Sequence, residues 1–422
     1  MPNSNLNQTN SASMGKKRLL VVSQHFWPEN FRITDIVAGF TANSIEVDVL
    51  CGLPNYPKGE WFDGYKYTGP RRQTHVGAQI FRAGEIRRKG NTSLRIFLNY
   101  VSFPFFALFS LPRLAGRKYD AVFCYETSPV LMMLPAIVYA KTHRVPLTTY
   151  VLDLWPDNLY SVLPIKNKLA RGLASGVSNW FYRRSPRLIA MSDKLATHLQ
   201  TVTAKKAPAI AVIPQYCEDF YAQDIEDKEL QQRFAGHFNI LFTGNISPAQ
   251  DLDNLVKAMQ LVNETEPTTN IQCLIVGDGM SKTQLKEIIA AHGVQKYFVF
   301  CGQQPATDIP KWTGIASALF AGLAKSDNLS LTVPAKITSY FAAGRPMLVA
   351  ADAEAARVAE ESGAALVSPA GDAQKLAQNI LALYHKTPAA RTAMGAAGRQ
   401  CYQKNYKRSN LLAQLKQFIF NE

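Results

Sequence analysis

The stretch KKRLLVVSQHFWPENFRITDIVAGFTANSIEVDVLCGLPNYP, residues 16–57, decides the fold class. An apolar run at 19–22 is followed by apolar residues at helical spacing over 31–40 and by alternating apolar residues over 45–49. Asn43 and Ser44 supply the turn between the helix and the second strand. The order strand, helix, strand is typical of a parallel sheet covered by helices.

The same alternation runs through the remaining sequence and starts again in its second half. Further strands are expected in the first half at 78–82, 120–125, 147–152, 187–191 and 209–213, and in the second half at 239–247, 270–279, 297–302, 317–322, 346–352 and 364–372. Helical stretches separate these short apolar runs. The sequence therefore predicts an α/β fold with two Rossmann-like, doubly wound parallel-sheet domains that face a central cleft.

Domain limits follow from these patterns. Two domains suit a chain of 422 residues, since one domain usually covers about 100–200 residues. Residues 1–16 are polar, lack the apolar core of a secretory signal and are expected to form a disordered tail. We expect the first domain at 17–215, the second at 216–395, and a C-terminal helix at 396–422 that crosses back to the first domain.

The positive charge of the chain is concentrated in its first half. Residues 1–215 hold 27 Lys and Arg against 12 Asp and Glu, a balance of +15, whereas residues 216–422 hold 19 against 20, a balance of −1. A basic domain beside a neutral one indicates an anionic partner, which could be phospholipid, nucleic acid or an anionic substrate. Because the interleaved basic and aromatic repeats of nucleic-acid binding are missing, we expect no nucleic-acid partner.

Neither a metal nor a cofactor is expected. The six cysteines stand apart, without a C-x-x-C pair or a His and Cys cluster at zinc spacing, and are interpreted as reduced thiols of a cytosolic protein. The dinucleotide fingerprint G-x-G-x-x-G and the phosphate loop G-x-x-x-x-G-K-[ST] are both missing from the sequence.

Residues 94–114, LRIFLNYVSFPFFALFSLPRL, form the most apolar segment, with about the length of a membrane span of roughly 20 residues. Arg95, Asn99 and Pro104 interrupt it, and the flanking sequences GEIRRKG and GRKYD are basic. We favour an interfacial helix that contacts an anionic membrane. A buried core helix is the alternative.

The stretch SLTVPAKITSYFAAGRP, residues 330–346, predicts a helix of about three turns whose start binds an anion. Pro334 suits the first helical position and Gly344 the end of the helix. Hydroxyls and one lysine accompany the unpaired N–H groups of the first turn. Glycines and an asparagine also follow other strands of this half at the same edge of the sheet, where open α/β sheets bind ligands. They are Gly244, Asn245, Gly277 and Gly302.

In the first half, VLDLWPDNL at residues 151–159 offers the comparable cluster. Asp153 ends a predicted buried strand, so its carboxylate is expected to orient a sugar hydroxyl or to stabilise positive charge at an anomeric carbon. It is also compatible with a purely structural role in its loop. HFWPENFRIT at residues 25–34 supplies acceptor-side candidates, namely Glu29, Asn30 and Arg32.

Seven motifs together carry a family resemblance over about residues 17–415. They are SQHFWPENFRITD, GLPNYPKG, LDLWPDNL, GNISPAQDLDNLVKAM, VGDG, TVPAKITSYFAAGRP and SPAGD. In combination they resemble the family-four glycosyltransferases of the GT-B fold, above all bacterial enzymes of O-antigen, capsule and colanic-acid synthesis such as N-acetyl-L-fucosaminyl transferases. The resemblance implies retaining transfer from a nucleotide sugar, usually UDP-linked, to a polyprenyl-diphosphate-linked glycan. It also implies a peripheral position on the cytoplasmic face of the bacterial membrane.

The chain departs from the wider family at its donor site. Many members carry two glutamates at the helix near Pro334, where this sequence has Leu331 and Ser339, and an Arg and a Lys after the first strand of the second domain, where Asn245 and Gln250 stand. The resemblance therefore implies a rebuilt diphosphate site. Lys336 is assigned charge neutralisation and a catalytic role with Asp153, and hydrogen bonding is assigned to Ser330, Thr332, Ser339 and Tyr340.

Two other functions stay open at this stage. A nucleotide-sugar 2-epimerase has the same fold and needs no lipid acceptor, and a non-catalytic basic protein that binds nucleotides or nucleic acids suits the charge alone. For the transferase we expect turnover without an essential Mg²⁺, because a fixed lysine can neutralise the leaving diphosphate.

Overall fold

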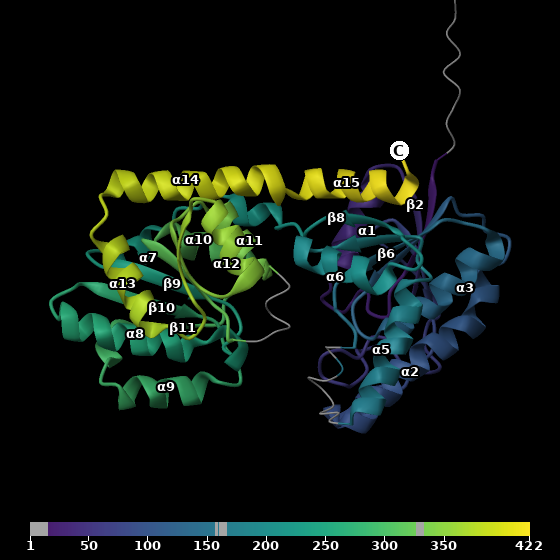
Figure 1. Ribbon diagram of the computed structural model, residues 1–422, viewed down its shortest axis with the longest axis horizontal. Helices are drawn as coiled ribbons and strands as arrows, with labels where there is room; N and C mark the ends of the chain where they lie inside the picture. Colours follow the sequence, from purple (N-terminus) through teal and green to yellow (C-terminus); the bar gives the residue numbers. More distant parts are fainter. Residues whose placement is uncertain (1–15, 157–158, 160–166, 326–332) are drawn as a thin grey trace, which may run out of the picture. The chain divides into compact units, whose positions relative to one another are not determined.

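The computed structural model describes residues 16–156, 159, 167–325 and 333–422 (Figure 1). The predicted tail therefore lies almost wholly outside the described residues. By their contacts the residues form two compact units, one comprising Met1–Leu188 with Phe418–Glu422 and the other Ile189–Gln417. Each unit is described by itself, and the domain limits predicted from the sequence stay a prediction.

The first sheet has eight strands in the order β3-β4-β2-β1-β5-β6-β7-β8. They are β1 Arg18–Val22, β2 Glu46–Cys51, β3 Arg72–His75, β4 Ala78–Arg82, β5 Ala121–Glu126, β6 Leu147–Val151, β7 Arg187–Ala190 and β8 Ala209–Val212. Strand β1 pairs in parallel with β2 and β5, and β3 pairs antiparallel with β4. All but β3 were predicted. The edge strand β3, with the sequence RQTH, has no apolar alternation because neither face is fully buried.

The helices of this part are α1 Ile33–Ala42, α2 Ser93–Ser110, α3 Met133–His143, α5 Lys168–Tyr182 and α6 Asp193–Thr203. Side-chain caps define three of their starts: Thr92 accepts from the backbone N–H of Arg95, Asn167 from those of Leu169 and Ala170, and Ser192 from that of Leu195. A short 3₁₀ helix, η3 at Val130–Met132, leads into α3.

The second sheet has six strands in the order β11-β10-β9-β12-β13-β14, and the recorded pairs are parallel. They are β9 Phe238–Thr243, β10 Ile271–Val276, β11 Phe298–Gly302, β12 Ala318–Gly322, β13 Met347–Ala350 and β14 Ala365–Ser368. The helices are α7 Lys228–Arg233, α8 Leu252–Thr265, α9 Lys282–Ala291, α10 Ile309–Gly314, α11 Ala335–Ala343, α12 Ala353–Glu361, α13 Ala373–Tyr384, α14 Pro388–Asn405 and α15 Arg408–Phe420.

Successive residues of β9 enter different cores. Ile240 and Phe242 pack in a cluster with residues of α8 and α13, whereas Leu241 packs in a second cluster with residues of α10 and α11. Because side chains alternate along a strand, this means that helices cover both faces of the sheet (Figure 1). The unit is therefore doubly wound, as predicted.

Each sheet contains a point where the order of its strands reverses. In the second sheet the chain runs outward from β9 to β10 and β11, and then returns to β12 on the other side of β9. In the first sheet β1 lies between β2 and β5 in the same way. Ligands of open α/β sheets bind at the carboxyl ends of the strands beside such a reversal.

The C-terminal helix differs from the prediction, which placed one helix at 396–422. Two helices occur instead, with a break at Tyr406 and Lys407. The break has a physical cause, since the Tyr406 carbonyl accepts a hydrogen bond from the Cys217 backbone N–H at 3.0 Å. The last residues belong to the first unit, where the Arg187 guanidinium donates to the Phe418 and Ile419 carbonyls at 3.3 and 3.2 Å.

Candidate functional site

Lys336 lies at the reversal point of the second sheet. It belongs to the first turn of α11, which begins at Ala335 with Pro334 as its N-cap residue, one position later than predicted. Its Nζ donates to Gln250 Oε1 in the loop after β9 and lies 3.6 Å from the centroid of the Phe242 ring. The lysine therefore reaches across from the segment after β12 to the carboxyl end of β9.

The Lys336 amine is close to losing its proton. Burial lowers its pKa from 10.5 to about 7. An ammonium on a protein surface would remain charged at any physiological pH, whereas this one gains or loses its charge near neutrality. An anion placed beside it would stabilise the charged form, so binding an anion here is coupled to proton uptake.

Backbone hydrogen bonds and close backbone contacts join the segments at the carboxyl ends of β9, β10 and β11. The Gly244 N–H donates to the Val276 carbonyl at 2.9 Å, and the Gly277 N–H donates to the Gly302 carbonyl at 2.8 Å. Gly277 has φ 152°, and a Cβ there would lie 1.9 Å from the Gly244 oxygen. A Cβ on Gly279 would lie 2.2 Å from the Ile246 oxygen. Only glycine fits these positions.

The other predicted donor-site residues lie in different surroundings. Asn245 is exposed, and the Ser339 hydroxyl donates to the Lys336 carbonyl at 2.9 Å. Tyr340 is 1% exposed, and its hydroxyl accepts from the Thr243 N–H at 2.9 Å. Burial raises the pKa of Tyr340 to about 12. In this structure Tyr340 supports the end of β9 rather than facing a ligand.

Ser330 and Thr332 lie outside the described residues. Gly302 ends β11 in the left-handed region at φ 72°, with no atom within 4 Å of the place of a Cβ. The second unit therefore brings Lys336, Gln250 and Gly244 together, with Gly277 and Gly302 beside them along the same edge of the sheet.

In the first unit, Asp153 follows β6 and is partly buried. A second carboxyl group, that of Glu126 at the end of the neighbouring strand β5, is fully buried. Burial and the charge of Asp153 raise the pKa of Glu126 well above its usual range. Carboxyl groups thus lie at or just after the ends of two neighbouring strands, and burial disfavours the ionised form of Glu126.

Sequence reasoning missed Glu126. The signal was available, because the run AVFCYE ends a strand with an acidic residue in the same way as VLD does. The alternation rule for strands identified the apolar part of the run and did not consider where its last side chain would lie.

Glu29, predicted to face an acceptor, is 3% exposed and acts inside the protein. One of its oxygens lies 2.8 Å from His25 Nδ1, and the other accepts from the backbone N–H groups of Asn55 and Tyr56, both at 2.7 Å. Glu29 therefore joins the loop after β1 to the loop after β2. Asn30 is exposed and Arg32 partly exposed.

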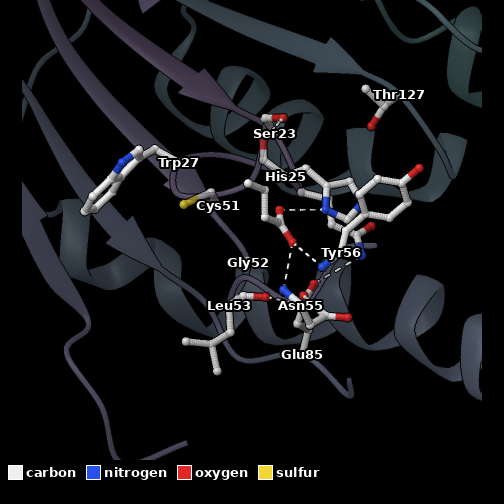
Figure 2. A network of polar contacts seen from close by, with 12 residues as sticks. Ser23, His25, Trp27, Cys51, Gly52, Leu53, Asn55, Tyr56, Glu85 and Thr127 are labelled. Atoms are coloured by element: carbon white, nitrogen blue, oxygen red, sulfur yellow. Dashed lines mark hydrogen bonds and ion pairs between the residues drawn. The ribbon is translucent and has the colours of Figure 1, made fainter. Parts of the chain in front are cut away.

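A second buried carboxyl group, that of Glu85, extends this network (Figure 2). Glu85 accepts from Asn55 Nδ2, and from Gln24 Nε2 at 3.1 Å. Burial and the charge of Glu29 raise the pKa of Glu85 well above its usual range. The network continues to α2, where Asn99 Oδ1 accepts from Gln24 and from Arg88 at 2.9 and 3.0 Å.

No group of three or more His, Cys, Asp and Glu suited to a metal occurs within the part of the chain that the structure describes.

The sequence of this chain is similar to those of known glycosyltransferases. Residues 237–386, which include Lys336, match the model described as Glycosyl transferases group 1. The chain is 23% identical to the probable glycosyltransferase WbjE of Pseudomonas aeruginosa over 71% of this chain and 74% of that protein. It is 22% identical to the putative colanic acid biosynthesis glycosyl transferase WcaI of Escherichia coli K12, over 80% and 84%. The 2-deoxystreptamine glucosyltransferase of Streptomyces kanamyceticus is 24% identical over 36% of this chain, and the match spans only 40% of that relative.

Solved structures agree on the fold. Sucrose-phosphate synthase from Thermosynechococcus elongatus superposes with a TM-score of 0.71 at 15% identity, covering 95% of this chain and 98% of that one. Anabaena Alr3699/HepE in complex with UDP has a TM-score of 0.67 at 14% identity, covering 96% and 100%.

The fold is thus GT-B, as predicted, with two α/β units built on parallel sheets. The second unit contains a group 1 glycosyltransferase domain, and the chain is a transferase enzyme.

Proposed function

We propose that this enzyme transfers a sugar, with retention of configuration, from a UDP-linked donor to a polyprenyl-diphosphate-linked glycan. The donor sugar would be an N-acetylated deoxyhexosamine, as in the N-acetyl-L-fucosaminyl transferases that the motifs resemble. The reaction would take place at the cytoplasmic face of the bacterial membrane during synthesis of a surface polysaccharide. The names of WbjE and WcaI, and the UDP bound by HepE, support this proposal.

The observation that carries the proposal is the position of Lys336. In the family that the sequence resembles, a basic residue after β9 neutralises the diphosphate, and here Gln250 stands at that position. The Lys336 amine donates to Gln250, so a cation from α11 lies where the loop itself supplies none. The N-terminus of α11, which has no side-chain cap among the described residues, adds a partial positive charge on the same side.

Lys336 would act most strongly in the transition state. As the bond to the sugar breaks, the leaving diphosphate gains negative charge, and a protonated amine beside it stabilises that charge. Binding of the dianion raises the pKa of the amine, so the ammonium form is present when it is needed. With a fixed cation in this place, turnover is expected without Mg²⁺. Activity that a chelator abolishes and Mg²⁺ restores would refute this part.

Asp153 is assigned a role toward the positive charge of the transition state, as Lys336 is toward the negative charge. Its carboxylate would stabilise the positive charge that develops at the anomeric carbon or would orient the acceptor hydroxyl. Burial and the charge of Asp153 raise the pKa of Glu126 and so disfavour a second negative charge beside Asp153. Asp153→Asn should lower kcat by about 10²-fold or more, within the range found when one electrostatic group is removed. Donor binding should change little.

A lipid-linked acceptor is supported by helix α2. Ser93–Leu114 is long and apolar enough to cross a membrane, and 39% of its most apolar window is buried. Its buried side carries the polar residues Asn99 and Ser102 together with Phe103, while Phe97, Phe105, Phe106 and Phe109 are exposed. The exposed apolar side suits a helix that lies on an anionic membrane surface.

Nucleotide binding can be tested before the acceptor is known. Thermal unfolding should be shifted upward by UDP more than by GDP, TDP or CMP, since ligand at 100 times its Kd stabilises by about 2.7 kcal/mol. Lys336→Gln should weaken UDP binding strongly and leave uridine binding nearly unchanged. Lys375→Gln, at an exposed lysine of α13, is the matched control. Equal losses for UDP and uridine would remove Lys336 from its role.

Transfer itself is then measured with labelled UDP-N-acetylhexosamines and membrane extracts that contain polyprenyl-diphosphate-linked glycans. A labelled product in the lipid fraction supports the proposal. A new sugar formed from the UDP-sugar alone, without lipid, would indicate a 2-epimerase instead.

A further inference from the structure

Helix α5 presents a second unpartnered apolar surface. Leu169 is 84% and Leu173 72% exposed, and Val177 and Trp180 follow at helical spacing on the same side. Of the fifteen residues of α5, only Ser178, Phe181 and Tyr182 are buried. An exposed apolar stripe of this length on a folded protein marks an interaction site.

The stripe of α5 resembles that of α2 in composition and spacing. On α2, Leu94 and Phe109 are 66% and 68% exposed, and Phe97, Val101 and Phe105 lie between them on the same side. Both helices pack against η3. We call the exposed apolar side chains of α2 and α5 together the two-helix face.

The charges around this face favour one partner. The sequence contains no Asp or Glu from Ile86 to Tyr119, nor from Asn158 to Ser192. Exposed basic residues accompany the stripes, namely Lys89, Arg95, Arg113, Lys168, Arg171 and Arg184. The Arg184 guanidinium also lies 4.3 Å from the centre of the Trp180 ring. Apolar stripes with cationic borders and a tryptophan at the edge match the interface of an anionic lipid bilayer.

The loop that carries Asp153 is held by both of these helices. From α5, the Tyr182 hydroxyl accepts a hydrogen bond from the Trp155 backbone N–H at 3.0 Å. Towards α2, the Trp155 indole Nε1 donates to the Ser128 hydroxyl at 3.0 Å, and that hydroxyl lies 3.4 Å from the Tyr100 hydroxyl. The Trp155 and Tyr100 rings also meet edge to face, with centroids 5.8 Å apart.

We propose that the two-helix face binds an anionic bilayer and that Trp155 transmits this binding to Asp153. The inference rests on the proposed function only in assigning Asp153 a role in transfer. A bilayer that contacts α2 and α5 together favours one arrangement of the two helices. Trp155 makes contacts that lead to both helices. The arrangement of α2 and α5 that the bilayer favours therefore also fixes the loop at Trp155, two residues after Asp153. Trp155 is thus a positioning residue.

Hydrogen exchange on the full chain tests both parts without any acceptor. Vesicles of phosphatidylethanolamine with 30% phosphatidylglycerol are expected to slow amide exchange in α2 and α5 at least threefold, and in residues 150–156 as well. Vesicles of phosphatidylcholine alone should do neither. If anionic vesicles protect α2 while α5 exchanges as before, the two-helix face is wrong. If they protect both helices and leave 150–156 unchanged, the coupling through Trp155 is wrong.

Two variants separate the surface from the coupling. Leu169→Gln with Leu173→Gln should reduce vesicle binding at least tenfold. Thr197→Gln with Thr201→Gln, exposed on α6 at the same spacing, should bind as the wild type does. Equal binding by both double variants would refute the part played by α5.

Ser128→Ala removes the hydroxyl between Trp155 and Tyr100 with little change in volume. It should bind vesicles normally and still show protection of both helices, yet lose the added protection of residues 150–156. The control is Ser110→Ala, because the Ser110 hydroxyl donates only to the Phe106 carbonyl of its own helix. Protection of 150–156 in Ser128→Ala equal to that in the wild type would overturn the coupling. Absence of sugar transfer in a separate assay would leave these results standing and count against the proposed function alone.

Discussion

Lys336→Met is expected to make the protein more stable and less able to bind UDP. Burial lowers the pKa of Lys336 from 10.5 to about 7, so the charged amine is disfavoured in the folded state. A tenfold change in proton affinity is worth about 1.4 kcal/mol, so a fall from 10.5 to 7 costs the folded protein at most about 5 kcal/mol below pH 7. Methionine has a similar length and carries no charge.

The direction in which stability changes with pH follows from the pH range over which the folded and the unfolded chain each keep the proton of Lys336. Below pH 7 the amine is charged in the folded and the unfolded chain, and the whole cost is present. Between pH 7 and 10.5 the unfolded chain keeps the proton while the folded chain releases it, so the stability of the wild type rises with pH. At pH 9 the remaining cost is at most about 2 kcal/mol.

The expected gain is smaller than these limits, because the amine contacts Gln250 and the Phe242 ring, and a cation over a ring returns about 1–2 kcal/mol. We expect Lys336→Met to gain about 2–3 kcal/mol at pH 6, or about 5–10 °C in Tm for a unit of this size. The gain at pH 9 should be near zero.

Thermal unfolding at pH 6 and pH 9, with and without UDP, measures all of these quantities. Lys375→Met, at an exposed lysine, should change Tm little and equally at both pH values. A Lys336→Met protein that is less stable than the wild type at pH 6, or whose gain is the same at both pH values, would refute the reasoning.

Three further predictions follow from the site. The affinity of the wild type for UDP should fall by up to about tenfold per pH unit from pH 7 to 9, whereas that of Lys336→Met should not change with pH. Titration calorimetry, with uridine as the control ligand, measures both affinities. An equal pH dependence in the two proteins would contradict the prediction. Gly277→Ala should lower the free energy of unfolding by about 2–4 kcal/mol, because the new Cβ would meet the Gly244 oxygen. Gly302→Ala should lower it by about 1 kcal/mol, because the space around Gly302 is open. Denaturant titration compares the two variants. Glu126→Gln should stabilise the protein increasingly as pH rises above about 4.5, since the buried acid must stay protonated in the folded state only. A gain unchanged between pH 5 and 8 would rule out a neutral Glu126.

The fold could be predicted because strands and turns are local patterns. Of the fourteen strands in the part of the chain that the structure describes, thirteen follow from short apolar runs ended by polar residues, and the polar edge strand β3 gave no signal. The start and end of α11 followed from Pro334 and Gly344 within one residue, since both act through their own backbone. Side-chain roles were harder, because they depend on residues far apart in the chain.

Glu29 and Tyr340 illustrate the difficulty. Both are polar residues near the ends of strands, and such residues serve equally well as ligands or as internal anchors. Glu29 satisfies two backbone N–H groups of the loop after β2, and Tyr340 satisfies the N–H of Thr243. The need to pair these buried groups becomes visible only when the loops are placed next to each other. The contact of Lys336 with Gln250 required the same information, since 86 residues separate the two.

The exposed phenylalanines of α2, namely Phe97, Phe105, Phe106 and Phe109, have a practical consequence for purification. In a detergent-free buffer these exposed side chains are in contact with water, and contact with another molecule of the same protein would cover them. Oligomers measured under such conditions would then report the absence of lipid, and we expect them to dissociate when mild detergent or nanodiscs are added.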